Sequence, residues 1–364
     1  MKKSLIALAA LAATATFAQS SVTISGALDG GVANVKLGNG TSATNMASGI
    51  HGASRLRFVG VEDLGGGTKA NFWLEMQPDF SNGTASSSGL FNRGAWVGLS
   101  GGFGEVRLGR QGTNSVAAVC DLDQMGCYSG FYGGGILFSG QGAPGATGSA
   151  LFAANPTRGG TQATSTVGGN TGADSTRYVR QVRYTLPTLA AGLTVNAAYA
   201  FGASNTAAGG TDGDSVGFDV TYANGPLTLV GSYQKAGADA GADKKGELTT
   251  VGGTYNLGVA SVGLGYQEEK ASGTGVAFTK GESTAITVLF PMGATTPYVK
   301  YGEHKYSGGT LGSVTNAKVS NVGARYALSK RTYVYADYVT NGAAVANAAS
   351  AQKNMASLGL VHSF

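Results

Sequence analysis

The chain has 364 residues, of which 61 are glycine, and its formal net charge is +5. Only 12% of the residues are charged, against about 25% in an average soluble domain, while 42% are hydrophobic. This composition and the low proline count of 7 exclude collagen and a proline-rich disordered chain, and no later apolar run approaches the roughly 18 residues of a membrane-spanning helix.

The first predicted element is a secretory signal peptide over residues 1–18. Two lysines form its basic start, residues 4–15 form an apolar stretch too short to cross a bilayer, and Ala18 precedes the expected cleavage site. Gln19 would then begin the mature chain, without the cysteine that a lipoprotein needs at this point. The pattern predicts an exported protein that can reside in a membrane only through strands.

After the signal peptide, apolar and polar residues alternate in segments of roughly ten residues, each bounded by turn residues. This is the period of strands that show one face to lipid and the other to water. The predicted strands cover residues 21–29, 54–62, 68–79, 91–100, 105–111, 176–185, 192–200, 215–222, 226–235, 247–255, 260–268, 282–290, 296–305, 318–328, 331–339 and 356–364.

The connections between these strands alternate between short turns and long loops, such as 36–53 and 116–175. Short turns on one rim and long loops on the other are typical of an outer-membrane barrel, and an even strand count places both termini on the short-turn rim. A soluble β-sandwich also alternates, but sixteen converging polar faces need an aqueous lumen. We therefore predict an all-β fold, a sixteen-stranded antiparallel transmembrane β-barrel over residues 19–364.

The candidate functional residues are arginines expected to project into the lumen at its narrowest part. Arg55 and Arg57 share one face of a strand, Arg93 begins another, and Arg177 follows the long loop directly. An arginine facing lipid near the bilayer midplane would cost about 2–4 kcal/mol, so these side chains are expected to point inward or to lie near an interface. The alternative is ordinary solvated charge on the barrel rim.

The segment 116–175 is too long to be a structureless loop without a role, and two interpretations remain open. It either folds into the lumen and narrows it, or it is an exposed outer loop. Asp121 and Asp123, at its start, either face the arginines across the opening or cap a turn. These acids and the pair Cys120 and Cys127 at the start of the segment favour the folded-in interpretation, in which acids opposite arginines would set a transverse field.

Only two cysteines occur, Cys120 and Cys127, and in an exported chain such a pair is expected to form a disulfide; two buried free thiols are the alternative. The 3 histidines are scattered and none lies near a cysteine, so no metal site and no cofactor are expected. No phosphate-binding loop or nucleic-acid-binding patch is found. A hydrolase would need a nucleophile with a base within reach, and the scattered histidines give little support for such a base, so no enzyme is predicted.

A possible subunit contact is suggested by the strands 91–100 and 105–111. Arg110 shares a face with Leu108, and by the same counting Trp96 points outward between Gly94 and Gly98. Small residues around one tryptophan suit close packing of neighbouring barrels. The alternative is a misread register, because a slip of one residue exchanges the two faces.

Several segments resemble one known family. They are the start at 19–23, Ser54-Arg55-Leu56, the run 61–65, Asn92-Arg93-Gly94-Ala95-Trp96-Val97-Gly98-Leu99, the run 103–111, the turn 326–332 and His362-Ser363-Phe364. Together they make the chain similar to the Gram-negative general diffusion porins, in the branch typical of beta-proteobacteria.

This resemblance implies a homotrimer of sixteen-stranded barrels in the outer membrane, each with its own channel and with an inward-folded third loop, here 116–175. It implies that Arg55, Arg93 and Arg177 form the basic cluster of the constriction, and that Phe364 is read by the barrel-assembly machinery. Outer-membrane lipid and lipopolysaccharide are the implied surroundings.

The sequence thus predicts a passive channel for small hydrophilic solutes and ions, with a preference for anions that follows from the placed arginines. Two alternatives stay open. A substrate-specific channel would need a track of aromatic or paired basic groups along the lumen, and an adhesin or enzyme on the same barrel would not conduct.

Overall fold

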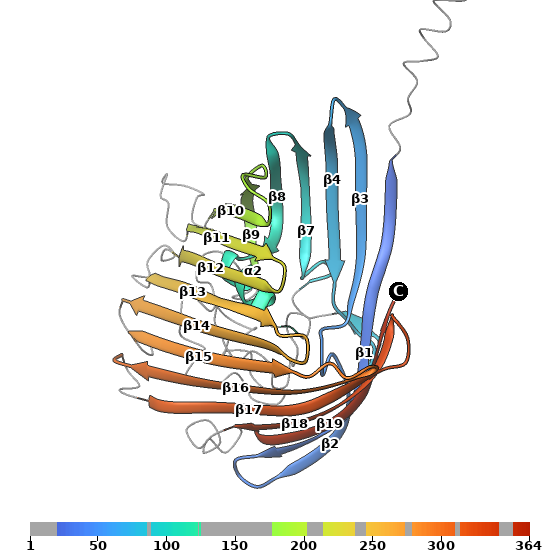
Figure 1. Cartoon of the computed structure of the whole chain (residues 1–364), viewed down its shortest axis with the longest axis vertical. Helices are drawn as coiled ribbons and strands as arrows, with labels where there is room; N and C mark the ends of the chain where they lie inside the picture. Colours follow the sequence, from blue (N-terminus) through green and yellow to red (C-terminus); the bar gives the residue numbers. More distant parts are fainter. Residues whose placement is uncertain are drawn as a thin grey trace, which may run out of the picture.

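The computed structural model describes residues 20–85, 89–122, 124, 177–201, 214–236, 245–273, 279–309, 314–341 and 352–364; the predicted signal peptide lies outside them. Figure 1 shows one large sheet wound around an interior, with a short helix inside. Its elements are β1 (Ser21–Leu37), β2 (Ser42–Ser48), β3 (Arg55–Gly65), β4 (Thr68–Met76), β5 (Pro78–Asp79), β6 (Thr84–Ala85), β7 (Gly94–Gly101), β8 (Gly104–Gly112), α2 (Asn114–Leu122), β9 (Arg177–Thr185), β10 (Leu193–Ala200), β11 (Ser215–Asn224), β12 (Leu227–Ala236), β13 (Lys245–Asn256), β14 (Ser261–Ser272), β15 (Lys280–Leu289), β16 (Thr295–Ser307), β17 (Val314–Ala327), β18 (Thr332–Asn341) and β19 (Gln352–Ser363).

The sheet closes because its first and last strands pair. Ala27 of β1 lies opposite Ser363 of β19, and all of the strand pairs are antiparallel. β3 pairs with the first half of β1, and β2 pairs with its second half. The two strands therefore fill one position in the wall. The 17 strands of the described sheet therefore make a closed barrel of sixteen positions, which confirms the predicted fold.

The main difference from the prediction lies at the first outer connection. Residues 36–53 were expected to form a loop, but β1 continues to Leu37 and returns as β2 through a turn at Gly40, which has a positive φ of 87°. The chain then bends inward at 49–54. The carboxylate of Asp29 holds this bend by accepting hydrogen bonds of 2.6 Å from the backbone N–H groups of both His51 and Gly52.

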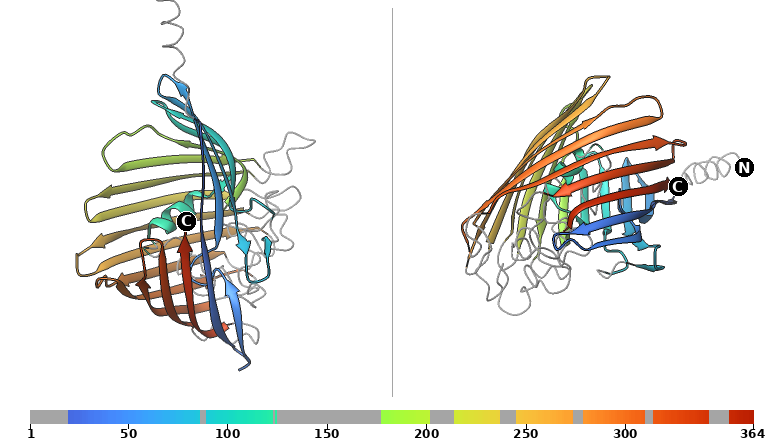
Figure 2. Two further views of the ribbon diagram at one scale, coloured as in Figure 1. Left: turned by 90° about the vertical axis from the view of Figure 1, so that its right-hand side faces the viewer. Right: turned by 90° about the horizontal axis from the view of Figure 1, so that it is seen from below.

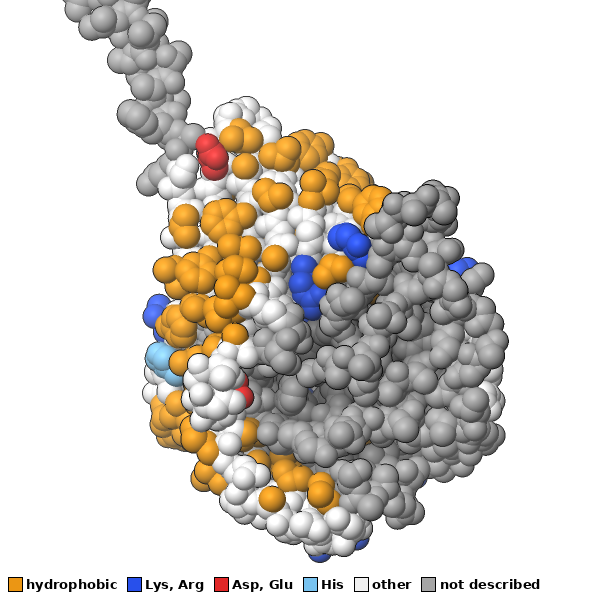
Figure 3. Space-filling view, turned by 180° about the vertical axis from the view of Figure 1, so that it is seen from behind, with side chains coloured by type: hydrophobic (Ala, Val, Ile, Leu, Met, Phe, Trp, Pro, Cys, Tyr) orange, Lys and Arg blue, Asp and Glu red, His pale blue; other side chains and the backbone are white. Residues whose placement is uncertain are grey.

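The two faces of the strands follow the predicted alternation. On β11, Val216 and Phe218 are half exposed on the outer face, whereas Asp219 is buried on the inner face. On β19, Leu358 and Leu360 are exposed and Ser357 is buried. Hydrophobic side chains are consequently spread over the described part of the outer surface in Figure 3, as a wall against lipid requires.

The inside of the barrel is mostly polar but holds a local apolar cluster beside the closing strands. Its buried members come from β1, the inward bend, β18 and β19, and they are Ala33, Ile50, Tyr335, Val339, Met355 and Val361. The bend at 49–54 thus packs on the lumenal side of the wall. The strands from β3, which also pairs with β1, to β9 carry the arginines described below.

The helix α2 lies inside the barrel and packs against β11, β12, β13 and β14 (Figure 2). Thr113 begins it by accepting a hydrogen bond from the N–H of Val116 through its hydroxyl. Leu122 and Val116 are buried, the latter against Leu248 of β13. In the part of the chain described here, no helix is both long and apolar enough to cross a membrane.

Candidate functional site

Arg55 and Arg57 lie on the lumenal face of β3. Their partners across the β1–β3 ladder are Ala27 and Ser25, which share the inner face with Asp29. Arg57 also lies opposite Glu75 of β4, and its Nε is 3.2 Å from a carboxylate oxygen of that residue. The sheet register therefore turns these two arginines toward the water-filled interior.

Glu75 is the acidic centre of this group of arginines. Its other carboxylate oxygen accepts a 2.5 Å hydrogen bond from Nε of Arg93, and the charge of Arg55 also acts on it. Arg93 precedes β7, and its backbone N–H bonds the carbonyl of Glu75, so the chain reaches the inner face before the regular ladder begins. One carboxylate thus fixes two guanidinium groups on the inner wall.

Arg177 joins the same group from the start of β9. Its Nε donates a 2.5 Å hydrogen bond to the main-chain carbonyl of Arg93, and its side chain is buried among its neighbours. Arg183, farther along β9, donates to Asp219 across the lumen wall at 2.7 Å. The structure therefore brings Arg55, Arg57, Arg93 and Arg177 to one region of the inner wall; their role as the constriction stays a prediction.

Asp219 links this wall to α2. It accepts hydrogen bonds of 2.6 Å from the side-chain amides of Asn114, in the first turn of α2, and Asn196 of β10, in addition to Arg183. Three donors leave the buried carboxylate well satisfied. It therefore acts as the anchor that holds the first turn of α2 against the wall.

The prediction that Trp96 lies at a subunit contact is wrong. Trp96 of β7 lies opposite Trp73 of β4 on the lumenal face, while Val97 and Leu99 are the exposed outer residues. The odd–even count of residues failed because Arg93 and Gly94 both lie opposite Glu75. This β-bulge adds one residue just before β7 and exchanges the faces of the residues on its two sides.

Glycines beside Trp96 make room for large lumenal side chains. A Cβ on Gly94 would lie 2.8 Å from Cδ1 of Trp73, and one on Gly98 would lie 2.5 Å from the main-chain oxygen of Val106 and 3.3 Å from Cγ of Arg107. The small residues therefore accommodate neighbours within the same wall and do not form an outer packing surface.

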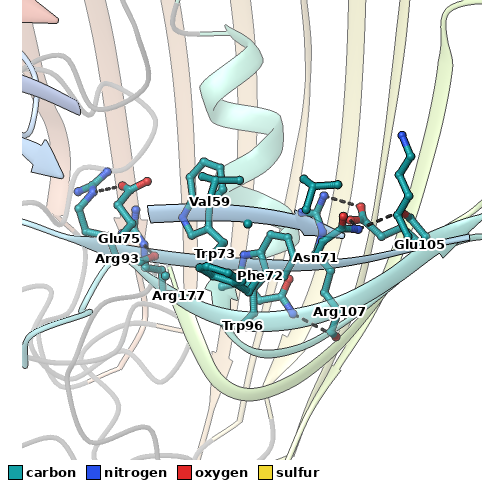
Figure 4. Close-up of a pocket in the computed structure, with 17 residues that line it drawn as sticks. Val59, Asn71, Phe72, Trp73, Glu75, Arg93, Trp96, Glu105, Arg107 and Arg177 are labelled. Atoms are coloured by element: carbon teal, nitrogen blue, oxygen red, sulfur yellow. Dashed lines mark hydrogen bonds and ion pairs between the residues drawn. The ribbon is translucent and has the colours of Figure 1, made fainter. Parts of the chain in front are cut away.

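A cavity of about 630 Å³ lies along this wall. Figure 4 shows Glu75, Arg93 and Arg177 at one end, the tryptophans in the middle, and Asn71 and Glu105 at the other end. The cavity is lined by residues that include Lys69, Asn71, Trp73, Glu75, Arg93, Trp96, Glu105, Arg107 and Arg177. Basic groups outnumber acidic ones in this lining, so an anion is favoured there.

Asp121 contacts the wall that carries α2. It accepts a 2.8 Å hydrogen bond from the hydroxyl of Thr221 on β11, and desolvation there raises the pKa of its carboxyl above the ordinary value. Asp123 and Cys127 lie outside the described residues, and Cys120 lies on α2. The predicted disulfide and the predicted facing of these acids toward the arginines stay predictions.

Arg110 lies on the outer face of β8 together with Leu108, as the parity count predicted. Its Nε donates a 2.5 Å hydrogen bond to the carbonyl of Asn92. A contact with a second subunit at this residue is a prediction.

Sequence reasoning assigned Trp96 to the wrong face and missed four other residues that organise the arginines: Glu75, Glu105, Asp219 and Trp73. For Glu75 a signal was available, because it shares its parity with Trp73 and Asn71 in the strand 68–79. Among the residues that the structure describes, no group of three or more His, Cys, Asp or Glu is placed to hold a metal ion.

Comparisons with known proteins agree with this architecture. Residues 4–343 match the family model described as Gram-negative porin. The chain is 37% identical over 277 residues to outer membrane porin protein 32 of Delftia acidovorans, covering 74% of this chain and 70% of the relative.

Two solved structures have the same fold. The anion-selective porin from Comamonas acidovorans superposes with a TM-score of 0.73 and 27% identity over 95% of this chain and 100% of that one. The trimer form of OmpT, an outer membrane protein of Vibrio cholerae, superposes with a TM-score of 0.65 and 16% identity over 95% of this chain and 99% of that one. With a family model that spans most of its length, this chain belongs to the Gram-negative porin family.

Proposed function

We propose that the channel prefers anions among the small hydrophilic solutes and ions that diffuse through it. As a Gram-negative porin, the protein is a multi-pass barrel of the outer membrane and a passive diffusion channel. The proposal rests on the charge of its lumenal wall. On the described inner faces of β3 to β9, including the residue before β7, the basic side chains are Arg55, Arg57, Lys69, Arg93, Arg107, Arg177 and Arg183, and the acidic ones are Asp63, Glu75 and Glu105.

The surplus of positive charge acts where the lumen wall excludes part of the solvent. An ion that passes there interacts with fixed guanidinium groups more strongly than it would in bulk water. Chloride is therefore stabilised and potassium repelled. The likeness to a porin described as anion-selective, that of Comamonas acidovorans, is consistent with this preference.

The test compares two variants that lose the same charge. R93Q removes a lumenal guanidinium, and R331Q removes an exposed one from the short connection before β18. We expect the reversal potential of R93Q in a KCl gradient to move toward potassium, while that of R331Q stays at the wild-type value. Equal values for the two variants would show that Arg93 does not set the selectivity.

We further propose that residues 116–175 form the constriction loop and that Cys120 and Cys127 form a disulfide near its start. The described beginning of this segment supports the loop assignment, because α2 packs on the inner side of β11 to β14. Thiol labelling of the denatured, unreduced protein is expected to find no free cysteine. Labelling of both cysteines would overturn the disulfide.

A homotrimer is the assembly that we propose, with Arg110 at or near the contact between barrels. The described OmpT structure is a trimer form, and Arg110 places a cation on an outer face that otherwise carries Leu108 and Val97. R110L is expected to lower the fraction of trimer in mild detergent. A variant of the exposed rim, R331L, serves as its control, and an unchanged trimer fraction in R110L would remove Arg110 from the contact.

The last residue and the outer surface suggest the remaining partners. Phe364 pairs its backbone with Gly26 of β1 in both directions, so the chain end is fixed beside the seam of the barrel. We expect the barrel-assembly machinery to read Phe364 before this seam closes, and lipid and lipopolysaccharide to contact the outer face. Deleting Phe364 should lower the amount of folded protein in the outer membrane. We propose no catalytic role for the chain.

A further inference from the structure

Two tryptophans and two arginines form a row across four neighbouring strands of the lumenal wall. Trp73 of β4 and Trp96 of β7 have nearly parallel rings, with an angle of 8° and centroids 6.3 Å apart. The guanidinium carbon of Arg107 lies 4.5 Å from the Trp96 ring centre, and that of Arg57 lies 5.2 Å from the Trp73 ring centre. We call Arg57, Trp73, Trp96 and Arg107 the arginine–tryptophan row.

The row is built into the wall. Gly94 leaves the space that the Trp73 indole occupies, and Gly98 permits the close approach of the β8 main chain and the stem of Arg107. Both outer members are also fixed by acids, since Arg57 is paired with Glu75 and Nη2 of Arg107 lies 2.5 Å from Glu105. The two indoles are therefore held in place on the lumenal face of the wall.

The arginines of the row are more accessible than Arg93. Their side chains keep 28% exposure for Arg57 and 33% for Arg107, compared with 5% for Arg93. The exposed part of each guanidinium group can therefore contact a ligand beside the indole rings.

The cavity along the row fits a small organic anion. Its volume of about 630 Å³ lies within the range of roughly 300–1,000 Å³ that is usual for small-molecule sites. Lys69, Arg93, Arg107 and Arg177 line it, against Glu75 and Glu105. Indole faces bind planar aromatic rings, and guanidinium groups bind carboxylates through paired hydrogen bonds.

From these contacts we propose that the arginine–tryptophan row is a binding subsite for aromatic carboxylates that pass through the channel. The ring of the solute lies against the indoles and its carboxylate contacts Arg107, which lines the cavity with them. An aliphatic carboxylate of the same charge gains the ionic contact alone. This inference rests on the proposed function, because it requires an open channel that admits anions.

Fluorescence gives a direct readout, because Trp73 and Trp96 are the only 2 tryptophans of the chain. Emission excited at the tryptophan band of the folded protein therefore reports on the row alone. Benzoate is expected to change this emission saturably, and cyclohexanecarboxylate, which has equal charge and similar size but no π system, is expected to bind more weakly. Free tryptophanamide serves as the control for light absorbed by benzoate.

Substitutions separate the ionic contact of the carboxylate from the aromatic contact of the ring. R107Q is expected to weaken benzoate binding by about tenfold, the usual effect of losing one charge-assisted hydrogen bond, whereas R331Q keeps the wild-type affinity. In a planar bilayer, benzoate should reduce the KCl current saturably in wild type and lose this effect in W96L. If W96L does not fold, the R107Q titration still decides the matter.

The outcomes distinguish this inference from the proposed function. Chloride-preferring conductance with equal binding of benzoate and cyclohexanecarboxylate, or with none of either, would overturn the aromatic subsite and leave the channel intact. Saturable benzoate binding that R107Q weakens, together with conductance, supports both. Absence of conductance in the folded wild-type protein would remove the proposed function itself.

Discussion

The guanidinium of Arg177 is joined to the main chain of Arg93, because Nε of Arg177 donates a 2.5 Å hydrogen bond to the Arg93 carbonyl. Two like charges that would otherwise repel are thereby held in one region of the lumen. Glu75 compensates part of this charge through Nε of Arg93 and through Arg57. The position and the strength of the positive field thus depend on a few hydrogen bonds.

Removing the acid should strengthen this field. In E75Q the amide can still accept a hydrogen bond, but the negative charge beside Arg93 is gone. We expect the reversal potential in a KCl gradient to move further toward chloride than in wild type. E62Q, which removes an exposed acid on the adjacent hairpin strand, should not move it; a shift toward potassium in E75Q would contradict the account.

The anchor of α2 predicts a loss of stability. D219N leaves the buried Arg183 without its ion partner, and this kind of change costs about 3–5 kcal/mol. The urea concentration at the unfolding midpoint should fall accordingly. N114A removes only the bond to α2, so it should raise open-channel current noise with a smaller effect on unfolding. A D219N protein as stable as wild type would exclude the anchor.

The space made by Gly94 can be filled deliberately. G94A would place a Cβ 2.8 Å from Cδ1 of Trp73 and force the indole to move, which should shift the tryptophan emission. The matched control is G102A, because no atom lies within 4 Å of the position of its Cβ. Identical emission from both variants and wild type would mean that Trp73 does not occupy this space.

The pKa of Asp121 predicts a dependence on pH. Desolvation raises this pKa, and the neighbouring charge of Asp219 adds to the effect, so Asp121 loses its proton at a higher pH than an ordinary aspartate. As the pH rises through the raised pKa, the lumen gains a negative charge and chloride preference should fall. D121N should lack this step between acidic and neutral pH.

The raised pKa of Asp121 also determines the direction in which the stability of the folded protein changes with pH. Because the pKa is higher in the folded protein than in the unfolded one, the folded state binds the proton more tightly. The contribution of Asp121 is therefore most favourable at low pH and declines as the pH rises from the ordinary pKa to the raised one. The unfolding midpoint of wild type should therefore fall relative to that of D121N as the pH rises through this interval. A rise of the wild-type midpoint relative to D121N would contradict the raised pKa of Asp121.

The alternation of apolar and polar residues was sufficient to predict the barrel. Each strand of the wall separates lipid from water, so its sequence must alternate with a period of two residues. The same pattern predicted that Arg55 and Arg57 point inward, and this held because their strand is regular there. It failed at Trp96, because the irregularity at Arg93 and Gly94 reverses parity without a mark in the sequence. Parity does not carry through such an irregularity.

The missed features depend on contacts between distant segments. β2 was not predicted because most of its residues 42–48 are polar and no regular alternation marks them, and it forms by pairing with an extended β1. Asp219 gave no sign of its role, since its donors Asn114, Arg183 and Asn196 come from three other elements. Such sites become visible only when the sheet register is known.

The central claim is that arginines on one lumenal wall make an open channel that prefers anions. Single-channel recording of the folded wild-type protein in a planar bilayer, with a KCl gradient across it, tests this most directly. The account predicts large ohmic steps and a reversal potential displaced toward the chloride equilibrium potential. A reversal potential displaced toward potassium would contradict the role of the arginines, and the absence of steps would contradict the channel.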